Sequence, residues 1–301
     1  YMDVRYEGTN GELQIELRDG INTPVGTIGK LSTLLLWHQQ DPPDAFEIAR
    51  NNKIYNYQKN KNPFIDHPEW VAKVYGLSSA PTISNINRNV TVPNENQNLI
   101  VSANIIDDVS VSSAQIIYTI NNGNQKFVNM TLSGGTLFTG TIPEIDYKDG
   151  DLLEYKIKAV DNQSNEKISE NYKVFTGLTP ISTLHQVNSN GELLYNGLYA
   201  KVKGVATVPN GLFSSSNLEV NIQDNTGGIV VYKVTAGATP FIVGKNYTVA
   251  GSLTQYNGLA ELVPDNVLTD IIDNGLDTEV KPTVKTFAEL IANAEQYEGM
   301  L

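Results

Sequence analysis

The chain has 301 residues, of which 40% are hydrophobic and 18% charged, and its formal net charge is −12. This length suggests two or three domains, and the apolar fraction excludes a disordered or collagen-like chain. The absence of cysteine excludes disulfides, a thiolate nucleophile and cysteine-based metal sites.

Negative charge increases along the chain, with a net charge of −2 over residues 1–77, −4 over 78–177 and −6 over 178–301. No region as a whole therefore has the basic balance of a strong nucleic-acid binder. The three histidines make an all-protein zinc site unexpected. No apolar run approaches the roughly 20 residues that a membrane span needs, so we expect none.

Residues 1–77 are predicted to be mixed structure with substantial helix. Alternating apolar residues predict a strand over Gly11–Asp19, and helical spacing predicts a helix over Gly29–Gln40. A second helix is predicted over Ala45–Gln58, with Asp44 as N-cap and Glu47 three residues later. We expect this helix to bury Phe46, Ile54 and Tyr57, to stop at Asn60–Pro63, and to be followed by a short helical piece from Pro68 to about Gly76.

Residues 78–177 have the pattern of a β-sandwich. After a linker at 78–82, short alternating runs recur about every ten residues between Asn, Gly and Asp turns. The expected strands are Leu99–Ile106, Ala114–Ile120, Gln125–Leu132, Leu137–Ile142, Leu152–Ala159 and Tyr172–Phe175. The turn at Asp161–Glu166 lacks calcium-loop spacing and is predicted to be an ordinary Asx-type hairpin.

Residues 178–280 are predicted to form a small five-stranded barrel of the OB type. The expected strands are Leu198–Thr207, Leu218–Gln223, Ile229–Val234, Asn246–Leu253 and Leu259–Leu262.

A possible repeat links this region to the last residues of the chain. Pro180, Tyr195 and Gly197 recur 102 residues later as Pro282, Tyr297 and Gly299. We interpret residues 281–301 as the start of a further repeat. The alternative is a C-terminal helix that packs on the barrel.

The densest polar cluster lies between Arg50 and Glu69. Arginine, lysine and amide side chains are those that hold phosphates and base edges. Without other information, a solvated helix end followed by an Asn-rich turn explains the same cluster. The candidate nucleic-acid-binding residues are Arg50, Asn51, Gln58, Asn60, Lys61 and Asn62.

Four ordered motifs in the first 75 residues resemble the C-terminal part of bacterial secreted endonuclease I-type nucleases. They are Tyr1–Gly8, Leu36–Pro42, Glu47-x-x-Arg50-Asn51 and the run from Gln58 to Glu69. One departure is Lys59, which stands where the family usually has glycine.

This resemblance implies a metal-dependent phosphodiesterase of the His-Me finger kind, in which a histidine acts as base and Mg²⁺ stabilises the leaving oxyanion. The corresponding motif precedes the Tyr-Met-x-x-Arg-Tyr segment, and nothing in this sequence matches it. We therefore assign no catalytic residue and no metal ligand in this chain, neither His38 nor His67, and we expect the chain as given to be inactive. Mg²⁺ is expected for the parent enzyme only.

The two β regions also resemble known modules. Residues 80–177 are similar to bacterial immunoglobulin-like or fibronectin III-like modules, and 178–280 are similar to the OB-fold module attached to several extracellular nucleases. Such barrels often stack bases on aromatic residues, which makes Tyr232 and Tyr256 candidates. Because only Lys233 and Lys245 accompany them amid negative charge, a non-binding or protein-binding barrel is the favoured alternative.

The sequence therefore predicts a multidomain, mainly β protein: an α-rich nuclease-domain remnant, an immunoglobulin-like β-sandwich and an OB-type β-barrel. We interpret it as an internal fragment of a secreted bacterial nuclease that cleaves DNA or RNA outside the cell or in the periplasm. Its first quarter should then present an apolar face to a missing hydrolytic core. The rival interpretation is a set of extracellular binding or adhesion modules on a nuclease-like platform. The sequence does not indicate an oligomeric state.

Overall fold

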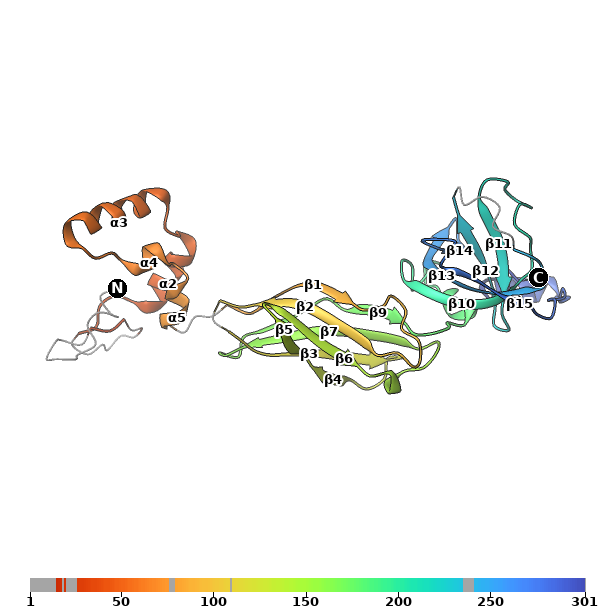
Figure 1. Ribbon diagram of the computed structural model, residues 1–301, viewed down its shortest axis with the longest axis horizontal. Coiled ribbons are helices and arrows are strands. Elements are labelled where there is room, and N and C mark those ends of the chain that lie inside the picture. Colours follow the sequence, from red (N-terminus) through yellow and green to blue (C-terminus); the bar gives the residue numbers. More distant parts are fainter. Residues whose placement is uncertain are drawn as a thin grey trace. The chain divides into compact units, whose positions relative to one another are not determined.

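The computed structural model describes residues 15–17, 19, 26–75, 79–108, 110–234 and 241–300. The chain divides into two compact units, a helical one before Thr82 and a β-rich one that holds nearly all of the later residues (Figure 1). The fold is mainly β, with several sheets and few helices. Of the helices described, none is long and apolar enough to cross a lipid bilayer.

The helical unit contains α2 (Leu31–Gln40), α3 (Ala45–Gln58), α4 (Pro63–Asp66) and α5 (Trp70–Tyr75). The predicted bounds of α3 are confirmed, and its N-cap is Asp44, which accepts a hydrogen bond from the Glu47 backbone N–H at 2.9 Å. Helix α4 was not predicted, although Pro63 at its start and Asn62 as its cap are ordinary helix-start signals. Most of the strand predicted at Gly11–Asp19, the motif Tyr1–Gly8 and Gly76 lie outside the described residues.

The prediction that α3 buries Phe46 and Tyr57 is wrong. Their side chains are 73% and 79% exposed, and Ile54 is half-buried. Helix α3 contacts α4 and the loop before it. Most of its other residues are exposed.

The sandwich consists of two antiparallel sheets that share one core (Figure 1). One sheet has the order β1 (Thr82–Arg88), β2 (Leu99–Ile106), β6 (Leu137–Ile142), β5 (Thr131–Gly134). The other has the order β4 (Lys126–Asn129), β3 (Val111–Ile120), β7 (Leu152–Asp161), β8 (Glu166–Ile168), with β9 (Tyr172–Phe175) also paired to β7. A short 3-10 turn, η2 (Glu144–Asp146), precedes β7. Alternate residues of β2 and β7 face the core, which is the period-2 burial that predicted these strands.

The single strand expected at Gln125–Leu132 is in fact two strands that belong to different sheets. Met130 lies between them and is buried in the core, so the chain crosses from one sheet to the other at this residue. The predicted Asx-type hairpin is confirmed, because the Asp161 carboxylate accepts hydrogen bonds from the backbone of Gln163 and Asn165 at 2.8 Å each.

The barrel begins with a short helix, α6 (Ile181–Leu184), and closes because β10 pairs with both β11 and β13. The strand order is β10–β11–β12–β14–β13–β15, and the β12–β14 pair is parallel. The strands are β10 (Tyr199–Ala206), β11 (Leu218–Gln223), β12 (Gly228–Lys233), β13 (Lys245–Tyr256), β14 (Leu259–Val263) and β15 (Ile271–Leu276). Strand β15 was not predicted, because it is largely exposed and lacks the alternation of a half-buried strand.

Two short helices follow the barrel. Helix α7 (Phe287–Ala292) has a full capping box, in which Thr286 and Glu289 bond reciprocally, and α8 (Ala294–Tyr297) comes directly after it. Residues 298–300 then lie against the barrel, as described below.

Candidate nucleic-acid site

The candidate site lies along one face of α3. Glu47, Arg50, Asn51, Ile54 and Gln58 are spaced three, four or seven residues apart, so they share one side of the helix. Opposite them is the loop 60–62, which leads into α4. Between helix and loop is a cavity of about 280 Å³, lined by Glu47, Arg50, Asn51, Ile54, Gln58, Asn60, Lys61, Asn62 and Ile65. All six candidates predicted in this region line this one cavity.

The loop that forms the far wall is held by Asn51. This side chain is 2% exposed, and its amide oxygen accepts from the Asn62 backbone N–H at 3.0 Å. Its amide nitrogen donates to the Asn62 carbonyl at 3.1 Å and to the Asp66 carboxylate at 3.2 Å. The Asn62 side chain in turn caps α4 by accepting from the Phe64 N–H at 3.1 Å. Both asparagines thus shape the cavity through bonds within the protein.

The remaining candidates differ in whether their side chains form hydrogen bonds or ion pairs within the protein. The Lys61 ammonium donates to the Asn52 side chain at 2.6 Å and lies 3.3 Å from the Asp66 carboxylate. By contrast, the side chains of Arg50, Gln58 and Asn60 make no hydrogen bond or ion pair with the described part of the chain. These three groups are therefore open to a ligand that enters the cavity.

The turn between α3 and the loop explains the sequence departure at Lys59. This residue is the C-cap of α3 and adopts a left-handed conformation, with φ 59° and ψ 19°. Glycine is the residue most often found in this conformation after a helix, because it has no Cβ. Lys59 nevertheless completes the turn, and its backbone N–H donates to the Tyr55 carbonyl at 2.9 Å.

The two histidines of the helical unit have structural contacts. His38 Nε2 lies 3.1 Å from the Pro68 carbonyl oxygen, which ties α2 to the segment before α5. His67 Nδ1 lies 3.2 Å from the Glu69 carboxylate, and its ring stacks on Trp70 with centroids 4.2 Å apart. In the described part of the chain, no three His, Asp or Glu side chains gather as a metal ion would require.

The two tyrosine candidates of the barrel are in different surroundings. Tyr232 is half-buried on β12, opposite Glu219 of β11, and its hydroxyl accepts from the Asn217 amide at 3.3 Å. Tyr256, at the end of β13, is 64% exposed. Of the nearby lysines, Lys245 is paired with Asp273 at 2.7 Å, which raises the lysine pKa through that hydrogen bond.

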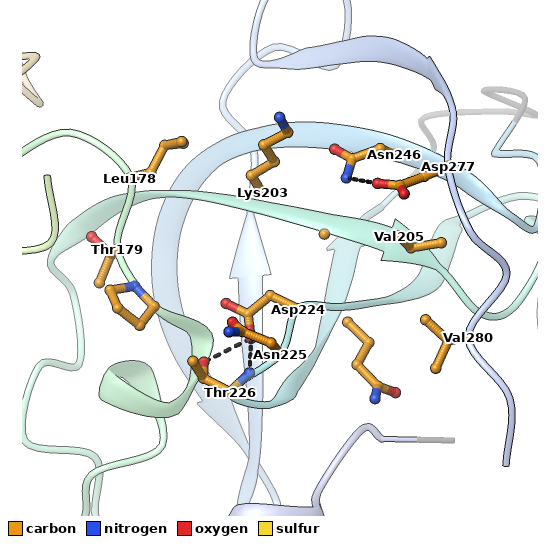
Figure 2. A pocket seen from close by; sticks show the side chains of 13 residues that line it. Leu178, Thr179, Lys203, Val205, Asp224, Asn225, Thr226, Asn246, Asp277 and Val280 are labelled. Carbon is orange, nitrogen blue, oxygen red and sulfur yellow. Dashed lines mark hydrogen bonds between the residues drawn. The ribbon is translucent and has the colours of Figure 1, made fainter.

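Sequence reasoning missed a second cavity, of about 570 Å³, beside the strand β10 (Figure 2). Its polar groups are largely bonded to one another. The Asp224 carboxylate accepts from the Thr226 backbone and hydroxyl at 2.6 and 2.7 Å, and the Asn246 amide donates to Asp277 at 2.8 Å. The sequence signal for it is the Asp-x-Thr-Gly run at residues 224–227.

The first cavity lies within the part of the chain that resembles known proteins. Residues 1–69 match the family model Endonuclease I. An extracellular ribonuclease of Bacillus amyloliquefaciens is 52% identical over 77 residues, which are 25% of this chain and 27% of that protein. The extracellular ribonuclease of Bacillus subtilis (strain 168) is 51% identical over the same length and shares.

Endonuclease YhcR of Bacillus subtilis (strain 168) is 33% identical over 103 residues, which are 33% of this chain and 8% of that protein. The chain thus spans about a quarter of the length of the extracellular ribonucleases and less of the endonuclease. The N-terminal region of this chain is therefore related to the secreted bacterial nucleases of the endonuclease I family.

Proposed function

We propose that the N-terminal region is the substrate-supporting half of a secreted phosphodiesterase domain, and that the α3 cavity contacts the nucleic-acid backbone. The observation that carries this proposal is the grouping of three open polar side chains, Arg50, Gln58 and Asn60, in one cavity of a nuclease-related region. A guanidinium can bind a phosphate through two parallel hydrogen bonds, and side-chain amides can bond sugar or base edges.

In this proposal the cavity binds and orients substrate but performs no bond cleavage. Its lining offers one carboxylate, Glu47, with amides and cations, and this is not a donor set for Mg²⁺. The base and the metal ligands of the parent enzyme are proposed to lie outside this chain.

The exposed apolar side chains of the helical unit support a missing partner. Of the residues from 26 to 75 whose side chains are described, only Asn51 and Val71 are buried. Large apolar side chains are exposed on each of the three longer helices, among them Leu36, Trp37, Phe46, Ile48, Trp70 and Val74. So many exposed large apolar side chains in a unit with almost no buried ones favour a packing partner outside the described residues. We propose that these side chains pack against the rest of the nuclease domain.

The β regions are proposed to be accessory modules. The sandwich topology is compatible with an immunoglobulin-like or fibronectin III-like spacer, and the closed five-stranded barrel is compatible with the OB type. The names of the relatives support an extracellular location for the parent protein.

The binding proposal is tested with Arg50→Ala in the full chain. Fluorescence anisotropy of labelled 15-nucleotide single-stranded RNA and DNA at low salt should show about tenfold weaker binding, because a charge-assisted hydrogen bond is lost. Lys53→Ala is the matched control, since Lys53 is an exposed cation of the same helix that does not line the cavity. Equal effects of the two variants would contradict a specific role for Arg50.

The activity proposal requires a longer protein. When the chain is extended upstream, plasmid DNA or total RNA should be cleaved in the presence of Mg²⁺, and EDTA should abolish cleavage. A correctly folded longer protein without such activity would refute the assignment.

A further inference from the structure

Residues 298–300 lie against the outer face of the barrel formed by β11, β12 and β14. The Glu298 carboxylate accepts a hydrogen bond from the Ala260 backbone N–H at 2.6 Å, and the Asn221 amide donates to the Gly299 carbonyl at 3.4 Å. The second oxygen of Glu298 lies 3.9 Å from Nδ1 of the buried His185, whose Nε2 is 2.7 Å from the Gly228 carbonyl. A backbone N–H of β14, a side chain of β11 and the histidine that follows α6 thus converge on this short segment.

The closest approach is between two glycines. A Cβ atom placed on Gly228 would lie 2.1 Å from the Gly299 carbonyl oxygen, and one placed on Gly299 would lie 2.9 Å from the Gly228 carbonyl carbon. Gly299 also has a φ of 69°, which L side chains rarely adopt. The two backbones touch only because both residues lack a side chain. The barrel surface therefore fits a polypeptide with glycine at this position.

The docked segment repeats a turn found at the start of the barrel. Leu198 N–H donates to the Tyr195 carbonyl at 3.0 Å, and 102 residues later Met300 N–H donates to the Tyr297 carbonyl at 3.2 Å. Both intervening glycines have positive φ, and a lysine ammonium lies over each tyrosine ring.

The first copy of this turn also docks on the barrel. Gly197 N–H donates to the Leu253 carbonyl of β13 at 2.8 Å, and Leu253 N–H donates to the Leu198 carbonyl at the same distance. The same local structure is thus used twice, on two different faces of one barrel.

This outer face is poorly suited to a nucleic acid. In five-stranded barrels of the OB type, the second and third strands form the usual oligonucleotide surface, and these are β11 and β12 here. Their shared end is occupied by Gly299, and the rest of the face carries Glu219 and Glu261 beside the half-buried Tyr232, whose hydroxyl is bonded to Asn217. Neither carboxylate has a cationic partner within the described residues. Burial and the charge of Glu219 raise the pKa of Glu261, as expected for like charges held near one another.

We propose that the Tyr-x-Gly turn is a docking element, and that its second copy, residues 297–300, is an intramolecular ligand that closes the β11–β12–β14 face. This face of the barrel then binds a segment of its own chain and does not bind nucleic acid. This inference is independent of the proposed nuclease function, because it involves no residue of the α3 cavity.

Hydrogen exchange on the full chain tests this proposal with Gly299→Ala, a change that alters the docked segment and leaves the barrel strands intact. Exchange at the Ala260 amide should become about tenfold faster or more, because alanine at this φ disfavours the turn and its Cβ would clash with Gly228. Gly191→Ala is the matched control: Gly191 also has positive φ, at 77°, but a Cβ there meets nothing within 4 Å. Unchanged exchange at Ala260 in Gly299→Ala would overturn the docking.

The same measurement with single-stranded dT15 at low salt tests the ligand class. Strands β11, β12 and β14 should gain no protection in either the parent chain or Gly299→Ala. Protection that appears in these strands would overturn the proposal, since it would make the face a nucleic-acid surface that the segment only masks. Protection confined to the helical unit would leave this inference intact and would report on the α3 cavity.

Discussion

The helical N-terminal unit and the β regions differ most in what they bury. In the sandwich, strands such as β2 and β7 place every second side chain in a closed core, and the barrel does the same with α6 across its end. Among residues 26–75 whose side chains the structure describes, Val71 is the only buried apolar side chain. The β regions thus supply their own packing partners, whereas the helices expose side chains that are suited to a partner.

Helix formation and core formation are therefore separate requirements. Caps and turn residues fix where α3 begins and ends, and these signals are local. Most helical stability in proteins nevertheless comes from packing of an apolar face. The helical unit should therefore be the less stable part of the chain.

The largest effect is expected in the sandwich core. Ile116→Ala removes a fully buried side chain of β3 and should lower the free energy of unfolding by about 2–5 kcal/mol, measured by urea unfolding followed by far-UV circular dichroism. Phe46→Ala in the helical unit deletes a larger but exposed side chain and should change stability by less than about 0.5 kcal/mol. A comparable loss in both variants would mean that Phe46 has a packing partner in this chain.

A smaller effect is expected from the buried amide of the helical unit. Asn51→Ala leaves the Asn62 backbone N–H and carbonyl without their partners, which should cost about 1–3 kcal/mol. Both tryptophans of the chain, Trp37 and Trp70, lie in this unit, so tryptophan fluorescence during urea unfolding reports on it selectively. Asn56→Ala, an exposed asparagine of the same helix, is the control and should leave the midpoint unchanged.

A gain in stability is expected at the end of α3. Lys59→Gly removes the steric strain of a left-handed conformation and should stabilise the helical unit by about 0.5–1 kcal/mol. Tryptophan fluorescence during urea unfolding measures this change. Lys59→Ala removes the same charge and keeps the strain, so it should give no gain. If alanine stabilised as much as glycine, the cause would be the lysine side chain and not its backbone conformation.

The smallest effect is expected on the barrel surface and depends on pH. The pKa of Glu261 is raised in the folded state, so the charged form is disfavoured there. This penalty is present above the folded pKa and vanishes below the unfolded value of about 4.3. Glu261→Gln should therefore raise the melting temperature slightly at pH 7 and leave it unchanged near pH 3.5.

The exposed Glu279 provides the control for this pH test, because Glu279→Gln should have no such effect. A Glu261→Gln variant that melts like the parent chain at pH 7 would show that neither burial nor the charge of Glu219 makes the ionised Glu261 destabilising.

The sequence predicted those features that depend on local signals. Helical spacing and Asp44 located α3, and period-2 alternation located β2. It did not predict the switch of sheets at Met130, because that depends on which distant strand pairs with each half.

The sequence predicted which residues line the candidate cavity. It did not predict which of them bind the loop and which stay open to a ligand. Residue type and spacing brought Arg50, Asn51 and Gln58 together, as the cavity shows. The Asn51 amide is engaged in hydrogen bonds with the backbone of Asn62, whereas Arg50 stays open. This difference depends on the path of the loop 60–62. A side-chain amide can hydrogen-bond to a loop backbone or to a ligand equally well, so residue type alone could not separate the two roles.

We propose that the apolar side chains exposed by the helical unit pack against another part of a nuclease domain. Tryptophan emission of the folded chain, with acrylamide quenching, tests it most directly, because Trp37 and Trp70 are 60% and 40% exposed. We expect solvent-exposed emission and strong quenching in this chain. In a protein extended upstream we expect a blue shift and protection of the tryptophans from acrylamide. Blue-shifted, protected emission in this chain alone would contradict it.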